Sequence, residues 1–309
     1  MIPQFPDFKP IELSDKEEVE KLTKQFPPYS DFNFVSMWSW DIQGEMRFAQ
    51  LNGNLVVRFT DYITRKPFYS FLGHNMPNET AKTLLDYAEE HGMPEMLKLV
   101  PEDSVRDLDP KVFLIEEDHN NHDYIIPTEI FKDYATKKTR TKKNSVKQFL
   151  KRFMPHTVHL DLSDPKVKET VYGLFTKWSE GKEDPLEVQN ELHALKRFIE
   201  NKQGEKDHVC TGVYVEDKLI GFCLSEKLNS HYSNIHFCKA DTSISPGVYA
   251  YILQENAKTL HENGHKYVNI EQDLGIDNIK KWKMSHGSNL FLKKYIVRYN
   301  THVEKLAKL

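Results

Sequence analysis

Short apolar runs alternate with polar segments in the first half of the chain. Residues 55–59 and 68–72 are rich in β-branched and aromatic side chains, and this composition predicts strands. Residues 79–91 have apolar positions at helical spacing, and Gly92 follows them as a stop signal. The first half is therefore predicted to combine strands with helices.

The second half of the chain has a clearer order of elements. Two amphipathic helices are predicted, and a hairpin, a third strand, a long helix, a short strand, a basic helix and a last strand follow. In the same order these elements are residues 165–179, 185–201, 209–215 with 219–224, 232–239, 247–263, 267–270, 276–285 and 290–297.

This order is typical of the acyl-CoA N-acyltransferase architecture, called GNAT-like. In that fold two neighbouring strands separate and the acyl donor enters between them. We expect the separation between the strand that ends at Lys239 and the strand that ends at Ile270. Another α+β domain with a mixed sheet is the alternative interpretation of the same order.

The length and a change in composition predict two domains. The chain has 309 residues, which suits two domains, and 39% hydrophobic residues exclude global disorder. Residues 116–123 form an acidic, polar segment, and residues 137–153 contain eight Lys or Arg. We place the boundary in the acidic segment and predict lobes at 1–122 and 123–309, with the active cleft in the second.

Charge, cysteines and hydropathy limit the functional classes. The formal net charge is -4, so a nucleic-acid contact requires a local basic patch. Cys210, Cys223 and Cys238 lack paired spacing and are expected to be reduced. Neither a signal peptide nor an apolar run of the roughly 20 residues that span a bilayer is recognisable. We therefore expect a cytoplasmic protein.

The turn before the long helix bears on the donor. A coenzyme A site usually has a glycine-rich turn there, because its N–H groups hold the pyrophosphate. Residues 242–247 read TSISPG, with one glycine and a proline that has no N–H to donate. This composition weakens acyl-CoA as the donor.

Three segments resemble the C-terminal domain of phosphatidylglycerol lysyltransferases. The first is the block from Tyr267 to Gly275, YVNIEQDLG, followed by Lys280, Lys281, Lys283 and Ser285 and then by Lys293, Lys294 and Tyr295. The second is Tyr124 followed by the basic segment and Phe149, and the third is RFTDYITRKPFYSFLG at residues 58–73. The resemblance extends over roughly residues 29–295, and its most specific part is Glu-Gln-Asp-Leu-Gly.

The resemblance implies a fold and an activity. The fold is α+β, with two tandem GNAT-like lobes that each contain a mixed sheet flanked by helices. The activity is transfer of an aminoacyl group from aminoacyl-tRNA, as in the related Fem peptidyltransferases. The best-known members carry an integral-membrane domain ahead of this one, which we expect to be absent here. The lipid acceptor therefore stays open.

Glu271 and Asp273 are the predicted catalytic residues. Strand alternation would place both carboxylates on one side and Gln272 on the other. One carboxylate would hold an ammonium group, and the other would orient or deprotonate the attacking group. In the alternative interpretation, Asp273 caps the following turn and Glu271 pairs with a lysine.

The other predicted site residues bind the substrate or its phosphates. Tyr124 and Tyr134 would stack on unpaired 3′ bases. The substrate-binding residues are Tyr124, Asn269, Gln272, Lys281, Lys283, Ser285 and Lys293. The tRNA- or phosphate-binding residues are Lys137, Lys138, Arg140, Lys142, Lys143 and Lys147. A solvated helix balanced by the acidic segment, ordinary surface lysines and contact with an anionic membrane are the alternatives.

No metal or resident cofactor is predicted. Gly264 interrupts the helix between His261 and His265, and a polar loop explains His119 and His122. The leading hypothesis is an aminoacyltransferase that moves an aminoacyl group, lysyl in the first instance, from tRNA to a hydroxyl or amine acceptor such as phosphatidylglycerol. The alternatives are an acyl-CoA-dependent N-acyltransferase and a non-catalytic module that binds tRNA or a membrane surface.

Overall fold

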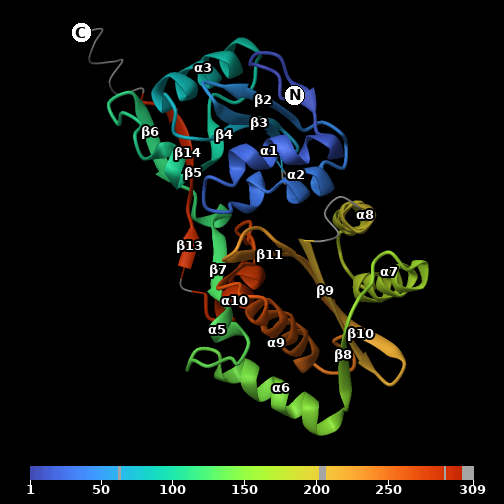
Figure 1. Ribbon diagram of the computed structural model, residues 1–309. Helices are drawn as coiled ribbons and strands as arrows, with labels where there is room; N and C mark the ends of the chain where they lie inside the picture. The colour runs from blue at the N-terminus through green and yellow to red at the C-terminus, as the bar shows by residue number, and fades with distance from the viewer. Residues whose placement is uncertain (62–63, 202–206, 289, 301–309) are drawn as a thin grey trace. The chain divides into compact units, whose positions relative to one another are not determined.

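A computed structural model describes residues 1–300 except 62–63, 202–206 and 289 (Figure 1). The chain divides into two compact units. Among the described residues, 1–122 and 292–300 form the first unit, and 123–291 form the second. Each unit is built around one seven-stranded mixed sheet.

The sheet of the first unit has the strand order β1-β2-β3-β4-β5-β14-β6. Its strands are β1 (Lys9–Pro10), β2 (Arg47–Leu51), β3 (Asn54–Thr60), β4 (Pro67–Leu72), β5 (Leu97–Pro101), β6 (Phe113–Glu117) and β14 (Lys294–Tyr299). Its helices are η1 (Leu13–Asp15), α1 (Lys16–Thr23), η2 (Ser30–Phe32), α2 (Phe34–Trp40), α3 (Pro77–Glu90), α4 (Glu102–Val105) and η3 (His119–Asn121).

Alternation along β3 explains why this sheet lies between two helical layers. Leu55, Val57 and Phe59 pack in the core with α1 and α2, whereas Val56 packs in the core with α3. Both faces of the strand are therefore buried, as its nearly continuous apolar sequence predicts.

The sheet of the second unit has the order β13-β7-β12-β11-β10-β9-β8. Its strands are β7 (Asp123–Pro127), β8 (Pro155–His159), β9 (His208–Val215), β10 (Lys218–Lys227), β11 (Tyr232–Ala240), β12 (Tyr267–Asn269) and β13 (Leu290–Leu292). Its helices are α5 (Thr128–Phe131), α6 (Arg140–Arg152), α7 (Pro165–Ser179), α8 (Pro185–Glu200), α9 (Gly247–Glu262) and α10 (Asp277–Ser285).

The long helix α9 packs against strands β9, β10 and β11, and α6 packs against α9 (Figure 1). The two helices approach closely at Gly247, where an added Cβ would lie 2.6 Å from the Ser145 carbonyl oxygen. Val146 and Phe149 are the α6 residues that join the core of this unit. Helix α7 contacts β10 and β11, and Phe198 of α8 packs against Phe237 of β11.

The two sheets repeat one topology, and the chain exchanges a strand between them. In each sheet four antiparallel strands are followed by a parallel pair, β4–β5 in the first unit and β11–β12 in the second. The next position is filled by β14 in the first sheet and by β7 in the second. The fold is therefore two tandem GNAT-like lobes.

The end of the chain differs from the sequence analysis. Residues 290–297 were expected to form one strand of the second lobe, but they contribute to two strands, and β14 lies in the first sheet between β5 and β6. Val297 is fully buried there. An apolar strand pattern predicts burial but does not specify which sheet contains the neighbouring strands. The sequence therefore could not show that β14 belongs to the first sheet.

Candidate active site

The parallel strands β11 and β12 pair over only three residues. The last pair is Asn234 with Asn269. Beyond Asn269 the chain stays with β7, because Ile270 donates its N–H to the Tyr124 carbonyl oxygen at 2.9 Å and Tyr124 donates its N–H to the Glu271 carbonyl oxygen at 3.1 Å. The two strands therefore separate at the position that the sequence analysis expected, and polar side chains lie at this point.

Glu271 does not continue the strand. Its φ is +61°, which is unusual for a residue with a side chain and costs about 1–2 kcal/mol. The Asn269 side chain holds this conformation by accepting a hydrogen bond from the Glu271 N–H at 2.7 Å. The predicted alternation of Glu271 and Asp273 on one strand face is therefore wrong, because the pleated backbone ends at Asn269.

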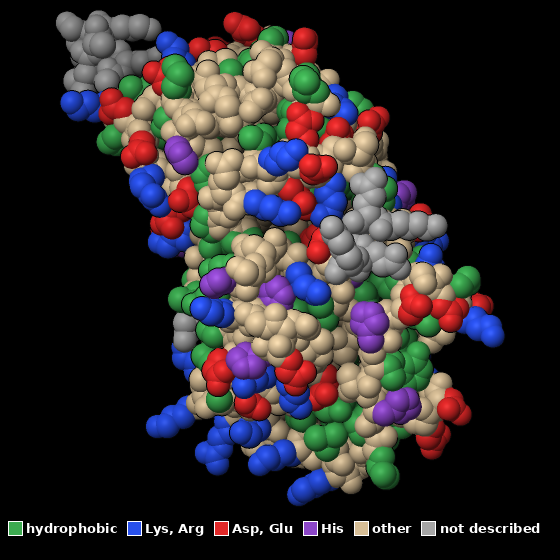
Figure 2. Space-filling view, viewed as in Figure 1, with side chains coloured by type: hydrophobic (Ala, Val, Ile, Leu, Met, Phe, Trp, Pro, Cys, Tyr) green, Lys and Arg blue, Asp and Glu red, His purple; other side chains and the backbone are tan. Residues whose placement is uncertain are grey.

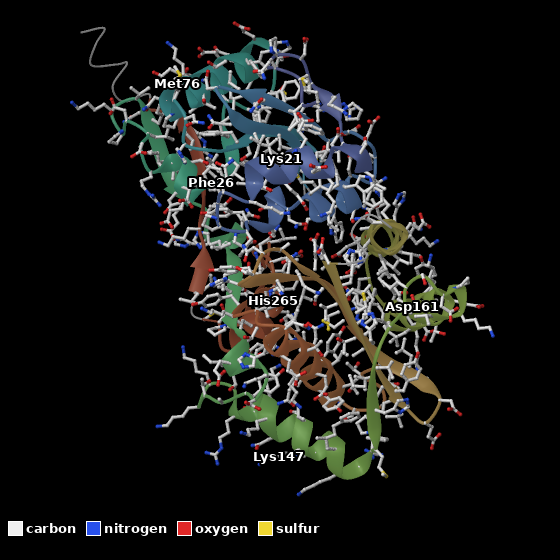
Figure 3. All side chains as sticks on the ribbon, viewed as in Figure 1. Lys21, Phe26, Met76, Lys147, Asp161 and His265 are labelled. Atoms are coloured by element: carbon white, nitrogen blue, oxygen red, sulfur yellow. The ribbon has the colours of Figure 1, made fainter. Side chains whose placement is uncertain are left out.

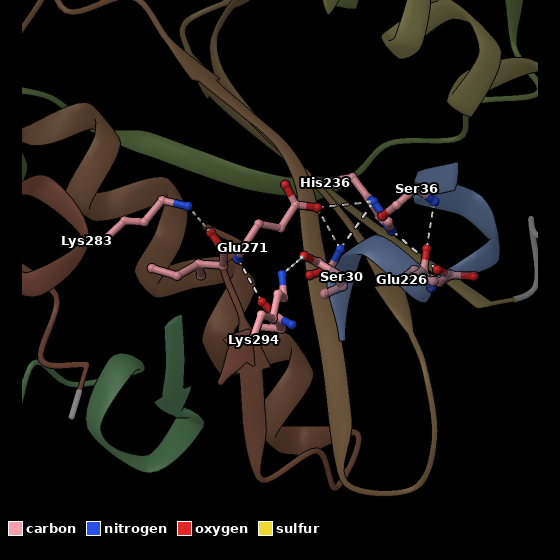
Figure 4. Close-up of polar contacts among 11 residues, drawn as sticks. Ser30, Ser36, Glu226, His236, Glu271, Lys283 and Lys294 are labelled. Atoms are coloured by element: carbon pink, nitrogen blue, oxygen red, sulfur yellow. Dashed lines mark hydrogen bonds and ion pairs between the residues drawn. The ribbon is translucent and has the colours of Figure 1, made fainter. Parts of the chain in front are cut away.

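A buried polar network connects Glu271 to the third strand (Figure 4). The Asn234 amide donates to Glu271 Oε1 at 2.9 Å and lies 3.3 Å from His236 Nδ1. His236 Nε2 lies 3.3 Å from Glu226 Oε2, and His236 Nδ1 lies 3.8 Å from Glu271 Oε1. The side chains of His236 and Glu226 are 1% and 2% exposed, whereas that of Glu271 is 25% exposed. Glu271 is thus the most exposed member of this set.

A β-bulge turns His236 toward this network. Ser225 pairs with Ile235 and Leu224 pairs with Phe237, so His236 is the extra residue of β11. Bulges often re-aim a side chain next to an active site. The Asn234 amide nitrogen lies against His236 Nδ1, and Glu226 Oε2 lies against His236 Nε2. These two contacts fix the orientation of the imidazole ring.

The environment of Glu271 makes its carboxylate a stronger base. Burial is the largest influence and raises the pKa of Glu271 above its ordinary value, against His236, Lys283 and the Asn234 hydrogen bond, which lower it. A base whose pKa lies closer to neutral pH removes a proton more effectively. Glu271 is therefore suited to accept a proton from an attacking hydroxyl or amine.

Asp273 has a different environment from Glu271. It is 1% exposed, and its carboxylate accepts hydrogen bonds from the Tyr124 hydroxyl at 2.5 Å and from the Gly275 N–H at 2.7 Å. These bonds fix the turn before α10. This agrees with the alternative interpretation of the sequence, in which Asp273 caps the following turn. Burial and Asp273 also raise the pKa of the Tyr124 hydroxyl.

Tyr124 and Tyr134 are not available to stack on bases. Tyr124 is 2% exposed, and the Lys283 ammonium lies 5.8 Å from its ring centroid. Tyr134 is also buried, and its hydroxyl donates to the Ala250 carbonyl oxygen at 2.9 Å. Both tyrosines support the core of the second unit, so the predicted stacking role is wrong.

The other predicted substrate-binding residues separate into three locations. Lys283 is buried and donates to the Ile270 carbonyl oxygen, so it supports the strand end rather than lining a rim. Lys281 is exposed on α10, and the Ser285 hydroxyl donates to the Trp282 carbonyl oxygen at 2.6 Å. Gln272 is half-buried between the two acidic residues. Lys293 belongs to the first unit, where it pairs with Glu117 at 3.2 Å.

The predicted phosphate-binding residues lie on α6 and in the turn before it. Helix α6 begins at Arg140, and Lys137 and Lys138 precede it. Its cations do not cover every face: Arg140, Lys147 and Lys151 lie opposite the buried Val146 and Phe149. Figure 2 shows Lys and Arg side chains along this edge, and Figure 3 shows Lys147 pointing outward. Lys143 is also exposed, whereas Lys142 is half-buried and burial lowers its pKa.

Asn234, His236 and Glu226 were not predicted from the sequence. A signal was present, because Asn234 and His236 are polar residues two positions apart in an otherwise mostly apolar strand. Alternation puts such residues on one face. Nothing in the sequence indicated that this face meets Glu271, which is 35 residues beyond His236 in the chain.

Comparison with protein families gives one match that extends over most of the chain. The family described as phosphatidylglycerol lysyltransferase, C-terminal, matches residues 24–298. A curated relative, an uncharacterized protein of Mycoplasmoides gallisepticum, is 26% identical over 194 residues. The aligned region spans 58% of the length of that relative and 60% of this chain.

Solved structures show the same fold. A protein of unknown function from Bacteroides thetaiotaomicron has a TM-score of 0.81 and 24% identity, with coverage of 97% of this chain and 100% of that chain. The C-terminal domain of a putative lysylphosphatidylglycerol synthetase from Agrobacterium fabrum has a TM-score of 0.62 and 10% identity, covering 96% and 95%. FemX has a TM-score of 0.57 and 11% identity, covering 98% and 100%. In the described part of the chain, no helix has the length and apolar character needed to cross a membrane.

Proposed function

The chain belongs to the phosphatidylglycerol lysyltransferase C-terminal family, and from this premise we propose that it transfers an aminoacyl group from aminoacyl-tRNA to a hydroxyl or amine acceptor. Lysyl is the first donor group to test, and phosphatidylglycerol is the first acceptor. The observation that carries the proposal is the partly exposed Glu271 at the separation of β11 and β12, with buried His236 and Glu226 behind it.

In this proposal Glu271 acts as the general base. The acceptor group loses its proton to Glu271 as its oxygen or nitrogen attacks the carbonyl carbon of the aminoacyl ester. The ester bond to the tRNA ribose then breaks, and the ribose oxygen leaves as a hydroxyl by taking that proton from Glu271. An aminoacyl ester is already activated, so positioning and proton transfer supply most of the remaining catalysis. His236 is a positioning residue, because it holds Glu271 through Asn234 and its electrostatic effect lowers the pKa of Glu271.

The start of α9 favours aminoacyl-tRNA over acyl-CoA as the donor. The Ser145 carbonyl oxygen lies against Gly247, the first residue of α9. In the turn that precedes α9, the Asp241 carboxylate accepts hydrogen bonds from the Ser243 N–H at 3.2 Å and from its hydroxyl at 2.5 Å. The Ser145 carbonyl oxygen is electron-rich and opposes a pyrophosphate at this helix start, whereas the charge of Asp241 is already compensated by the Lys177 and Lys218 ammonium groups.

Helix α6 supplies the proposed contact with tRNA. Arg140, Lys143, Lys147 and Lys151 are exposed, and residues 140–152 contain neither Asp nor Glu. Such a stripe suits the phosphates of an acceptor stem. Leu150 and Met154 are exposed beside it, at 46% and 92%, and they support contact with an anionic lipid surface as the second candidate.

A transfer assay tests the proposal. The full chain is incubated with tRNA charged with radiolabelled lysine, and with vesicles that contain phosphatidylglycerol or with fractions of a cell extract. We expect label to leave the tRNA and enter one acceptor class, and we expect the Glu271→Gln variant to lose this transfer.

The controls separate the rival functions. If the label stays on tRNA in every fraction while the protein binds labelled acetyl-CoA tightly, the acyl-CoA alternative replaces the proposal. If the wild-type protein and the Glu271→Gln variant bind tRNA equally well and neither transfers label from any charged tRNA, the protein is a binding module.

A further inference from the structure

The end of β6 and the turn after it bring three metal-binding side chains together in the first unit. Glu117 is the last residue of β6, His119 begins η3, and His122 follows η3. The spacing is Glu-x-His-x-x-His, and one atom from each side chain lies within 4.8 Å of the others. From the sequence both histidines were expected in a polar loop, because spacing alone does not show that the turn folds back on the strand.

The distances between these atoms suit one small cation. His119 Nδ1 lies 3.4 Å from Glu117 Oε1, and His122 Nε2 lies 3.6 Å from the same oxygen. Tetrahedral zinc with metal–ligand distances of about 2.0–2.1 Å places neighbouring ligand atoms roughly 3.3–3.4 Å apart. The two distances from Glu117 are close to this value, and all three ligand atoms lie within 4.8 Å of one another, so side-chain rotation would bring them onto one ion.

Backbone hydrogen bonds hold this turn in place. Asp118 donates its N–H to the Lys294 carbonyl oxygen at 2.9 Å, and Asn121 donates its N–H to the Asp118 carbonyl oxygen at 3.0 Å. The Asn121 amide also donates to the Asp118 carboxylate at 2.8 Å. The three candidate ligands thus stand on an ordered strand end rather than on a loose loop.

We propose that the first unit binds a divalent transition-metal ion, with zinc as the expected type, through Glu117, His119 and His122. Two imidazoles and one carboxylate form a set that zinc accepts and that magnesium and calcium do not prefer. The His119 side chain is 72% exposed, which leaves a fourth position open to water. The chain passes directly from His122 into β7. The bound ion would therefore hold the segment that precedes β7 against the end of β6.

Lys293 competes with the ion and gives the proposal a distinctive test. Its ammonium lies 3.2 Å from Glu117 Oε1 and 3.3 Å from Oε2. A bound cation would take Oε1, and the ammonium would keep Oε2 or turn to solvent, since its side chain is 40% exposed. Removing this positive charge should therefore tighten metal binding, whereas removing a ligand should weaken it.

The experiment titrates the full chain, stripped of metal with a chelator, with Zn²⁺ by calorimetry and with Co²⁺ by visible absorption. We expect one equivalent to bind, with tetrahedral cobalt bands. Glu117→Gln and His122→Ala should each weaken binding by at least about tenfold, and Lys293→Gln should tighten it. His91→Ala, which removes an exposed histidine of the same unit, is the matched control and should leave binding unchanged.

Two outcomes would overturn the proposal. One is wild-type binding that His122→Ala does not weaken, because the ion then sits on other histidines. The other is no saturable binding of either metal at concentrations up to the millimolar range. Thermal melts in metal-free buffer identify a variant that fails to fold, and Lys293→Gln, which removes no ligand, keeps the test decisive in that case.

Discussion

The two lobes share a topology but differ at the point where their parallel strands separate. In the first lobe β4 and β5 pair at Tyr69 and Leu97, and the chain after β5 forms α4. Ser104 of α4 accepts a hydrogen bond from the Gly73 N–H at 3.0 Å, which ties α4 to the end of β4. In the second lobe residues 270–276, all of them described, form no helix before α10, and Glu271 turns toward Asn234 and His236 instead.

The difference shows that the strand separation alone does not make a site. The residues of β4 beyond Tyr69 are Ser70, Phe71 and Leu72, which have no titratable group near neutral pH. The corresponding part of β11 contains His236, and the neighbouring hairpin strand contributes Glu226. The first lobe therefore uses the shared topology for packing, and the second keeps ionisable groups there.

The largest expected effect comes from the carboxylate that follows the parallel pair of the second lobe. Glu271→Gln should lower aminoacyl transfer by about 10²–10⁴-fold, because the amide cannot accept the proton of the attacking group. Glu102→Gln, at the exposed position directly after β5, is the matched change in the first lobe and should leave the rate near wild type. Equal losses in the two variants would contradict the comparison. The assay measures initial rates of label transfer.

The second expected effect concerns the surface cations of the two lobes. In the first lobe Lys21 of α1 and Lys24, which directly follows this helix, pair with glutamates of α1, whereas α6 contains no acidic residue. The triple change Lys143→Ala, Lys147→Ala and Lys151→Ala should reduce the slope of log affinity for tRNA against log salt by about 2–3.

The control for this measurement is Lys21→Ala with Lys24→Ala, which should leave the slope unchanged. Filter binding at several salt concentrations gives the slopes. If the α6 variant keeps its tRNA slope but no longer sediments with vesicles that contain phosphatidylglycerol, α6 contacts lipid rather than tRNA.

A third change tests whether the point where β4 and β5 separate, in the first lobe, has a structural role. Ser104→Ala leaves the buried Gly73 N–H without its acceptor and should lower the free energy of unfolding by about 1–3 kcal/mol. Transfer measured at a temperature where the variant is folded should stay near wild type. A loss of transfer as large as that of Glu271→Gln would give the first lobe a catalytic role. Urea denaturation followed by circular dichroism measures the stability.

The smallest expected effect is a change in pH dependence. A hydrogen bond of about 1 kcal/mol corresponds to roughly fivefold in rate, so His236→Gln should cause a modest loss. His236 lowers the pKa of Glu271, so its removal should raise that pKa. The base acts only when deprotonated, and the rate falls as pH falls through its pKa. The acid limb of the pH–rate profile should therefore move to higher pH, and an unmoved limb would contradict the positioning role.

Local sequence signals predicted many of the elements that carry the proposed site. The apolar spacing in the sequence before Gly92 identified the helix α3, and the hairpin, third strand and long helix of the second lobe were placed nearly at their observed bounds. Glu271 and Asn269 were named from the sequence, and both lie at the strand separation. These predictions succeeded because they depend on periodicity and on residues close together in the chain.

The sequence by itself therefore determined the GNAT-like order of the second lobe, the basic helix and the acidic block after β12, and the family resemblance implied the tandem arrangement. Only the tertiary structure separated the roles of Glu271 and Asp273, since a positive φ at Glu271 ends the alternation that a strand would impose. Only the tertiary structure also showed that His236 and Glu226 lie close to Glu271 and that β14 belongs to the first sheet. The physical reason is the same in each case: strand pairing and buried hydrogen bonds select partners across long stretches of chain, and no local pattern specifies those partners.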